Sequence, residues 1–360
     1  MSNNHDMLVK WLSLSSIGDL LKERLGEESE EYVFPEDFER AIADIGFRAV
    51  VFDGGDASSS DIIIVGDGLR NYQFSSGNNN TNSLVKSIRF VGYTGLKIPR
   101  YCFYGGQALT EFICPKTVTL IEMYAFYNCR NLTHLWLPKN VAFDSGNAYV
   151  LQNCFSLTTL GEEGHGYRVE FEAGATTYPN LSYSNGLLEI YVPEGVVNVY
   201  SLSYCTSLNL IEFPSTLVRL PNISNSTSLT EIRFPNGNNV VDWDGASLSG
   251  CRSLRTLHLP KCPNFLSSQS ILSNCVGLTS VETGSIGFGA TVAARNDSLT
   301  GCTQTGLTIT AYVMPEYIST FITNVRNKAT HATIIIKAPY EITYNGVTYL
   351  PGETVVTSTP

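Results

Sequence analysis

Nine cysteines and five histidines are the residues of this sequence with the widest chemical use. Thiolates act as nucleophiles and metal ligands, and paired thiols form disulfides. However, no C-x-x-C pair occurs, and the number of cysteines is odd. Six of them recur at one position of an internal repeat: Cys129, Cys154, Cys205, Cys251, Cys275 and Cys302. Since Ser184 and Ser226 fill the same position, we expect buried, unpaired thiols and a requirement that is steric rather than chemical.

The other residue types that could carry chemistry form no catalytic pattern. None of the histidines belongs to an H-E-x-x-H or another close metal-ligand pair. Phosphate-loop and nucleophile-elbow motifs are absent, and the glycines at 66 and 68 lack the third glycine and the helix of a dinucleotide fingerprint. Glu162 and Glu163 are adjacent, so in an extended loop their carboxylates point apart. The sequence therefore predicts no enzyme activity, no metal and no cofactor.

The elements that position these residues come from one repeated stretch, for which Ala125 to Pro138 is the template. With Cys129 as the marker, the equivalent positions are separated by 21 to 30 residues: Asn82, Gly106, Cys129, Cys154, Ser184, Cys205, Ser226, Cys251, Cys275 and Cys302. A period in that range is typical of a solenoid.

Each column of the repeat predicts a physical role. The nine rows from Gly106 onward carry a large apolar residue three before the marker, which indicates a core position: Phe103, Phe126, Leu151, Leu181, Leu202, Ile223, Leu248, Leu272 and Leu299. Gly or Asn precedes the marker except at Tyr183 and Tyr204, which predicts a left-handed turn. Apolar columns then alternate with polar ones and end in proline, which predicts short strands stacked into one parallel sheet.

The pattern N-C-x-x-L-x-x-L-x-L-P, preceded by A-F, resembles the BspA-like (Treponema pallidum type) leucine-rich repeat family over residues 82–305. The resemblance implies a right-handed solenoid used for adhesion or protein recognition, without catalytic residues. The expected fold is a leucine-rich repeat solenoid with a parallel β-sheet on one face and a mostly irregular other face. A small helical N-terminal module and a β-rich C-terminal cap are expected to flank it.

We expect four parts: a helical docking module at 1–50, a strand and loop cap at 51–81, the solenoid at 82–305, and a helix plus β-hairpin cap at 306–360. Hydrophobic spacing predicts helices at 17–25 and 35–46. Asn345-Gly346, between two apolar runs, predicts a type I′ hairpin turn. The polar insertion at 161–178 is either neutral drift or a binding loop.

The positions between the buried strand residues must face solvent, and they supply the candidate binding residues. One outward column is apolar or aromatic at Ile113, Trp136 and Tyr191, and its neighbour contributes His134 and Leu210. Strands ~4.8 Å apart would bring the aromatic positions onto one surface. Contact with a protein or cell-surface glycan is one interpretation. Cover by an end module or a neighbouring subunit is an equal alternative.

Composition restricts the partners. The chain has 23 basic and 33 acidic residues, a net charge of −10, and no basic cluster, so nucleic acid is not expected to bind. No apolar stretch long enough for membrane insertion is present. The segment 34–45 resembles a short N-terminal segment of phage tail proteins, and no export signal is visible. We expect a virion component, tail-associated, that docks to other virion proteins through its end modules. A bacterial surface adhesin and a cytosolic scaffold are the alternatives.

Overall fold

The computed structural model describes residues 49–52, 61–65, 75–76, 79–80, 84–138, 141–144, 149–161, 168–169, 177–235, 246–259, 261–295 and 297–360. Two compact units divide the chain. The first comprises Met1–Tyr167 and Pro179–Ser184, and the second comprises Arg168–Tyr178 and Asn185–Pro360. The helices predicted at 17–25 and 35–46 lie outside the described residues, as does most of the 161–178 insertion.

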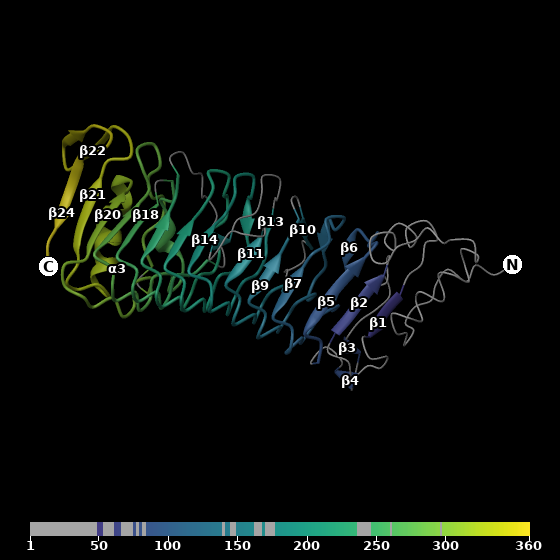
Figure 1. Cartoon of the computed structure of the whole chain (residues 1–360). Helices are drawn as coiled ribbons and strands as arrows, with labels where there is room; N and C mark the ends of the chain where they lie inside the picture. The colour runs from purple at the N-terminus through teal and green to yellow at the C-terminus, as the bar shows by residue number, and fades with distance from the viewer. Residues whose placement is uncertain are drawn as a thin grey trace, which may run out of the picture. The chain divides into compact units, whose positions relative to one another are not determined.

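In the first unit, one short strand of each repeat pairs in parallel with the strand of the next repeat (Figure 1). The strands are β7 (Glu111–Ile113), β9 (His134–Trp136) and β11 (Thr159–Gly161). Each step keeps the same position of the repeat in register, with Phe112 opposite Leu135 and Leu135 opposite Leu160. The predicted parallel sheet of a repeat solenoid is therefore confirmed. Prolines end β7 and β9 two residues on, because proline has no N–H to donate to a neighbouring strand.

A second row of two-residue strands lies in the same turns of the first unit. These strands are β6 (Lys97–Ile98), β8 (Leu120–Ile121) and β10 (Ala142–Phe143), which pair in parallel. Ile98, Ile121 and Phe143 of these short strands are buried, and so are the predicted core residues of the main sheet, such as Phe112 and Leu135. Each repeat thus closes a turn around apolar side chains, and each buried Leu or Phe contributes roughly 1.5–3 kcal/mol.

Parallel pairing in the first unit also includes a strand before residue 82. β2 (Asp61–Val65) pairs in parallel with β5 (Ser87–Val91), with Ile62 opposite Ile88, and in antiparallel fashion with β1 (Ala49–Phe52). The segment 51–81, for which strands and loops were expected, thus contains β2. A two-residue antiparallel pair, β3 (Ser75–Ser76) with β4 (Asn79–Asn80), lies between β2 and β5 in the sequence.

The second unit repeats the same arrangement. Parallel pairing joins β12 (Arg168–Val169) to β14 (Glu189–Tyr191), β14 to β16 (Leu210–Glu212), and β16 to β17 (Glu231–Arg233). The short strands β13 (Thr177–Tyr178) and β15 (Asn198–Val199) pair in parallel as well. A further sheet has the order β18 (Thr256–Leu259), β19 (Ser280–Thr283), β20 (Thr308–Tyr312), β21 (Thr333–Lys337) and β24 (Thr354–Ser358).

After Cys302 the repeat contains one additional residue before the strand. Val281, six residues after Cys275, pairs with Ile309, seven residues after Cys302. Ile309 then pairs with Ile334 of β21. Parallel pairing therefore continues through β21, and only β24, which is antiparallel to β21, ends it.

The C-terminal segment contains the predicted helix and hairpin. The single turn η3 (Pro315–Tyr317) leads into α3 (Ile318–Arg326), which buries Ile318, Phe321 and Val325. β22 (Ile342–Tyr344) and β23 (Val347–Tyr349) form the hairpin. Asn345 and Gly346 have φ values of 49° and 80°, as a type I′ turn requires. The β-rich cap expected at this end is present.

The turn column before the marker is left-handed, as predicted. Asn128 and Asn153 have φ values of 63° and 65°, and the two exceptions, Tyr183 and Tyr204, also lie at positive φ, 67° and 58°. The backbone conformation is thus a property of the column. Tyrosine accepts it there although it lacks the freedom of glycine.

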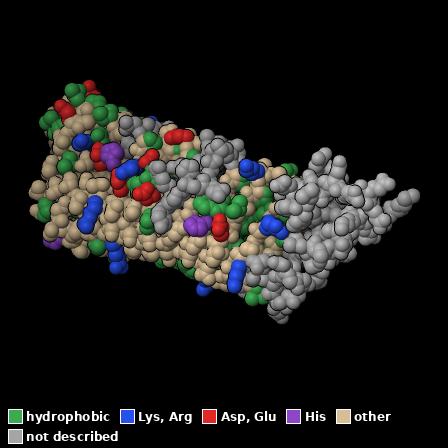
Figure 2. Space-filling view, in the orientation of Figure 1, with side chains coloured by type: hydrophobic (Ala, Val, Ile, Leu, Met, Phe, Trp, Pro, Cys, Tyr) green, Lys and Arg blue, Asp and Glu red, His purple; other side chains and the backbone are tan. Residues whose placement is uncertain are grey.

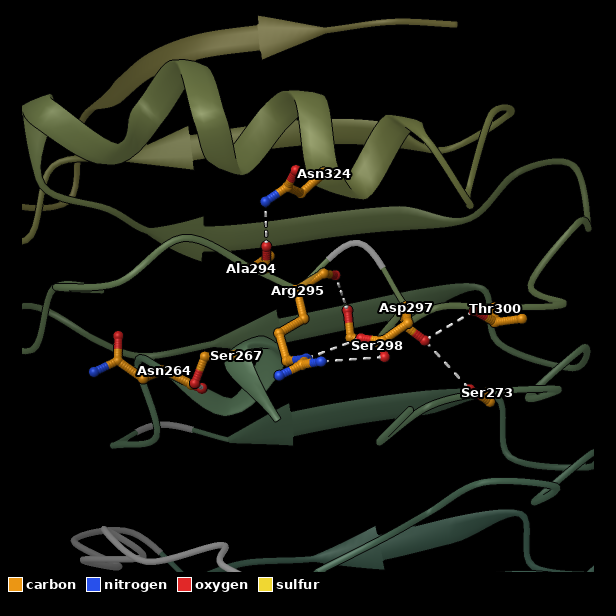
Figure 3. A network of polar contacts seen from close by, with 9 residues as sticks. All are labelled: Asn264, Ser267, Ser273, Ala294, Arg295, Asp297, Ser298, Thr300 and Asn324. Atoms are coloured by element: carbon orange, nitrogen blue, oxygen red, sulfur yellow. Dashed lines mark hydrogen bonds and ion pairs between the residues drawn. The ribbon is translucent and has the colours of Figure 1, made fainter. Parts of the chain in front are cut away.

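A polar network holds the long connection between β19 and β20 in place (Figure 3). The amide of Asn324, on α3, donates to the carbonyl oxygen of Ala294 over 2.6 Å, and the Arg295 backbone N–H donates to the Leu266 carbonyl in the short helix η2 (Phe265–Ser267). Arg295 also pairs with Asp297 over 3.0 Å, which lowers the pKa of that carboxyl. The network therefore fixes a connection against α3 and η2.

Candidate functional site

The outward columns of β7, β9 and β11 bring three of the five candidate residues together. Ile113 lies opposite Trp136, and Glu111 lies opposite His134. Ile113 is 54% exposed, although most isoleucines of the unit are buried. Figure 2 shows hydrophobic side chains next to a histidine and an acidic side chain over β7 and β9. The first unit thus has an aromatic and aliphatic patch, the Trp136 patch, made of Glu111, Ile113, His134 and Trp136.

Side-chain contacts hold the Trp136 patch in one arrangement. Trp136 Nε1 donates to Glu111 Oε1 over 3.0 Å, and the Trp136 and His134 rings stack with centroids 5.7 Å apart and planes 1° apart. On its other side, His134 Nδ1 lies 2.9 Å from Thr159 Oγ1. An indole that is fixed before binding loses little side-chain entropy when a partner covers it. The arrangement is suited to recognition.

The other two candidate residues, Tyr191 and Leu210, belong to the second unit. The Tyr191 hydroxyl donates to Glu189 Oε2 over 2.9 Å. Two strands away in the sheet, the Arg233 guanidinium contacts both carboxylate oxygens of Glu231, at 2.7 and 3.1 Å, and lies 3.7 Å from Glu212. This surface is polar and its charges are paired.

Leu210 corrects the assumption that every outward position is exposed. Its side chain is only 7% exposed. In the parallel register Leu210 lies between Glu189 and Glu231, whose longer side chains flank it on both sides at a strand spacing of ~4.8 Å. Thr159, in the same column of the first unit, is also buried. A single leucine in this setting offers a partner little apolar surface, so Leu210 is removed from the candidate site.

The cysteines lie in positions where they cannot serve as nucleophiles. All nine are free and buried, which confirms the prediction of unpaired thiols. Burial raises the pKa of Cys129 and of Cys251 to about 12 and that of Cys302 to about 11. At neutral pH these groups are therefore neutral thiols, and the thiolate is the reactive form.

The requirement for cysteine is chemical as well as steric, contrary to the expectation. Cys129 Sγ donates to the carbonyl oxygen of Phe103 over 3.0 Å, one repeat earlier. The same bond recurs at other markers, from Cys154, Cys251, Cys275 and Cys302, and from the hydroxyl of Ser226. The marker side chain thus supplies a donor for a turn carbonyl of the preceding repeat.

In the described part of the chain, His, Cys, Asp and Glu side chains form no group of three or more that could hold a metal ion. The helices described there include none of the length and hydropathy that crossing a membrane requires. Hydrophobic side chains gather over β22 at the C-terminal end in Figure 2, where Tyr340, Val347 and Leu350 are exposed.

The columns two and five residues before the marker contain a feature that the prediction missed. They place Tyr101 and Tyr104 in one repeat, Tyr124 and Tyr127 in the next, and Tyr149 in the third. The structure stacks these rings across repeats. The signal was present in the sequence, as Y-x-x-Y at the same place in two consecutive repeats.

A family model described as "BspA type Leucine rich repeat region" matches the chain in six copies, over residues 72–164 and 178–290. Together these ranges include more than half of the chain. They contain the strands that carry all of the candidate residues. No curated protein matches the chain.

Several solved structures are similar to the chain at low identity. The pneumococcal vaccine antigen PcpA is 15% identical, with 78% of each chain covered and a TM-score of 0.38. A leucine-rich cell surface protein from Faecalibacterium prausnitzii is 15% identical over 73% of this chain and 86% of that one, with a TM-score of 0.31. An internalin from Listeria monocytogenes is 14% identical over 88% and 82%, with a TM-score of 0.28. These distant likenesses carry no functional conclusion.

Proposed function

Because the chain belongs to the BspA-type leucine-rich repeat family, we propose that it is a recognition protein rather than an enzyme, and that it binds a protein partner through the Trp136 patch. The family resemblance implies adhesion or protein recognition. The observation that carries the proposal is the exposure of Ile113 beside an indole that Glu111 and His134 hold in place. Tryptophan in such a setting is a common anchor of protein interfaces.

We further propose that the protein works at a cell surface, which was the alternative to the virion assignment. Membership of the family supports an adhesin or another surface recognition protein. No comparison supports a virion component, and the segment that resembles phage tail proteins lies outside the described residues. Mass spectrometry of washed cell envelopes is expected to detect the chain. Detection in purified virions and not in envelopes would contradict this placement.

Site-specific photo-cross-linking tests the patch directly. With p-benzoylphenylalanine in place of Ile113, washed cells are expected to yield a covalent adduct with a different protein. The same residue in place of Val276, which is 46% exposed and lies in the second unit, is the matched control. Trp136→Ala is expected to weaken binding of the adduct partner, once purified, by about 2 kcal/mol or roughly 30-fold.

Two outcomes would contradict the proposal. An adduct formed only with a second copy of this chain would show that the patch is a subunit interface, which is the alternative stated for the outward columns. An affinity unchanged by Trp136→Ala would show that the partner binds elsewhere, for which the 161–178 insertion is the next candidate.

A further inference from the structure

Five tyrosines in the turns of the first unit form two stacked columns, here called the tyrosine ladder. Tyr101 and Tyr124 stack with centroids 5.0 Å apart, and Tyr124 and Tyr149 with centroids 5.4 Å apart. Beside them, Tyr104 and Tyr127 stack at 5.2 Å. Edge-to-face contacts at 5.8 and 5.5 Å join the two columns within each of the first two repeats. The ladder therefore repeats one chemical group at nearly constant spacing.

The fold does not require these rings. The equivalent of Tyr101 and Tyr124 is proline at 179 and 221 and alanine at 246. Moreover, Tyr101 and Tyr124 have φ values of 59° and 61°, a conformation that is unfavourable for a bulky residue. All five rings of the ladder are half-exposed. Strained, half-exposed aromatic side chains that the core does not need indicate a role in contact with another molecule.

The charge on the ladder is positive. The exposed Arg100 guanidinium lies 5.1 Å from the Tyr101 ring and 5.9 Å from the Tyr124 ring. The nearby carboxylate of Glu122 is already bound by Lys97 Nζ and by the Arg100 backbone N–H. Within the described ranges, the Arg100 guanidinium forms no ion pair; its hydrogen-bond contact is with Met123 Sδ at 3.4 Å. Among the described residues around the ladder, the Arg100 guanidinium is thus a cation without a carboxylate partner.

Like Arg100, the tyrosines favour oxygen-rich, negatively charged partners. Because the ring faces stack on one another, a partner meets ring edges rather than faces, and ring edges carry the positive part of the quadrupole. Desolvation and neighbouring Tyr101 raise the pKa of Tyr124, so its hydroxyl stays protonated and able to donate at neutral pH.

The spacing separates two classes of partner. An extended peptide presents side chains on one side every ~6.8 Å, since each residue advances ~3.4 Å. It would fall out of step with rungs 5.0 and 5.4 Å apart. In a linear polysaccharide, one pyranose ring advances the chain by a length close to one rung, and its hydroxyls match tyrosine hydroxyls as donors and acceptors. We propose that the tyrosine ladder, together with Arg100, binds a linear glycan whose sugar units carry carboxylates.

Calorimetric titration of the full chain with oligogalacturonates tests this inference. A trisaccharide is expected to bind more tightly than the monosaccharide, because three rungs are available, and its fully methyl-esterified, neutral form is expected to bind at least tenfold more weakly. Arg100→Gln is expected to remove the difference between the acidic and the neutral form.

Tyr124→Asn removes the central ring and keeps the backbone, because asparagine tolerates positive φ. It is expected to lower the affinity for the trisaccharide at least tenfold. Tyr204→Asn is the matched control: Tyr204 also has positive φ, is 40% exposed, and lies in the second unit. Wild-type affinity is expected for this variant.

The proposal is overturned if Tyr124→Asn binds the trisaccharide as the wild type does, or if no oligogalacturonate binds. Equal binding of the acidic and neutral forms would overturn the requirement for carboxylates. If a protein partner is found whose binding Tyr124→Asn abolishes while no glycan binds, the ladder is a protein interface. Absence of glycan binding leaves the proposed function untouched, whereas a protein partner that requires Tyr124 would place a protein-binding site on the ladder.

Discussion

At the scale of single residues, the marker side chain is chosen for the bond it can donate. The carbonyl three residues before the marker of the preceding repeat accepts a hydrogen bond from the backbone N–H of its own marker, as Phe103 does from Gly106, and it keeps a second lone pair for another donor. Cys129 donates to it over 3.0 Å, and the Ser226 hydroxyl does so over 2.9 Å. Ser184 does not form this hydrogen bond, because its hydroxyl is buried and has no hydrogen-bond partner among the described residues. The same column thus contains one position that is not optimal.

Ser184→Cys is expected to stabilise the protein by about 1 kcal/mol, the typical net value of one buried hydrogen bond. The longer C–S bond brings the donor nearer to the neighbouring turn, and the thiol leaves less polar surface unsatisfied. Urea denaturation of the variant and the wild type measures the change. Ser226→Cys is the matched control, and little change is expected because its hydroxyl is already bonded. Equal effects of both substitutions would contradict the explanation.

At the scale of the repeat, side chains in the left-handed turn column determine what the next turn can contain. Asn274 and Gly301 occupy that column in consecutive repeats, and both have positive φ. A Cβ added at Gly301 would lie 2.3 Å from Asn274 Oδ1, well inside van der Waals contact. Asn225 and Gly250 show the same relation at 2.5 Å. At these two positions glycine leaves the asparagine side chain in place. It is not a general requirement of the column, because Asn153 follows Asn128 there and Tyr183 follows Asn153.

Gly301→Ala is expected to destabilise the protein by about 2 kcal/mol, from the left-handed conformation and from the shift that it forces on the Asn274 side chain. Gly306→Ala separates the two effects, because Gly306 has the same φ of 82° and nothing lies within 4 Å of its added Cβ. That control is expected to lose only about 1 kcal/mol. Thermal and urea unfolding give both values. If Asn274→Gly fails to recover part of the loss caused by Gly301→Ala, the clash is not the cause.

At the scale of the whole molecule, the thiols indicate how the protein responds to oxidation and to pH. All nine are buried, and the described chain contains no disulfide. The ordinary pKa of these groups, 9.0, is raised by burial to about 11 at Cys302 and about 12 at Cys129. Below pH 9 both the folded and the unfolded chain keep the thiols protonated. Above it the unfolded chain ionises first, so stability is lost as the pH rises towards the folded pKa values.

Thiol labelling is therefore expected to be slow in the native protein at pH 8 and to detect nine thiols after denaturation. The free energy of unfolding is expected to decline between pH 9 and about 11. Tyrosines and lysines also titrate in this range. The Cys302→Ser variant keeps their contribution and lacks that of one thiol, so the difference between the variant and the wild type gives the contribution of Cys302. Fewer than about seven thiols under denaturing conditions would show that disulfides form in the native compartment.

The sequence by itself determined the repeat and its inward face. Buried residues recur at every second position of a strand and at the same position of each repeat. The core columns, the strand-ending prolines and the Asn345-Gly346 hairpin could therefore all be predicted from the sequence. The same reasoning identified the candidate binding residues Ile113, His134 and Trp136, because they occupy fixed places in consecutive repeats.

Only the tertiary structure showed the features that depend on contacts between repeats. The period of the strand places Leu210 on the solvent-facing side of the sheet. It is nevertheless buried, because the side chains of Glu189 and Glu231 on either side are longer. The donor role of the marker, the close approach of Asn274 to Gly301, and the stacking of Tyr101 on Tyr124 likewise involve atoms about one repeat apart. Periodicity states which way a side chain points. It does not state how far its neighbours reach, and that distance decides whether an outward position is a binding surface.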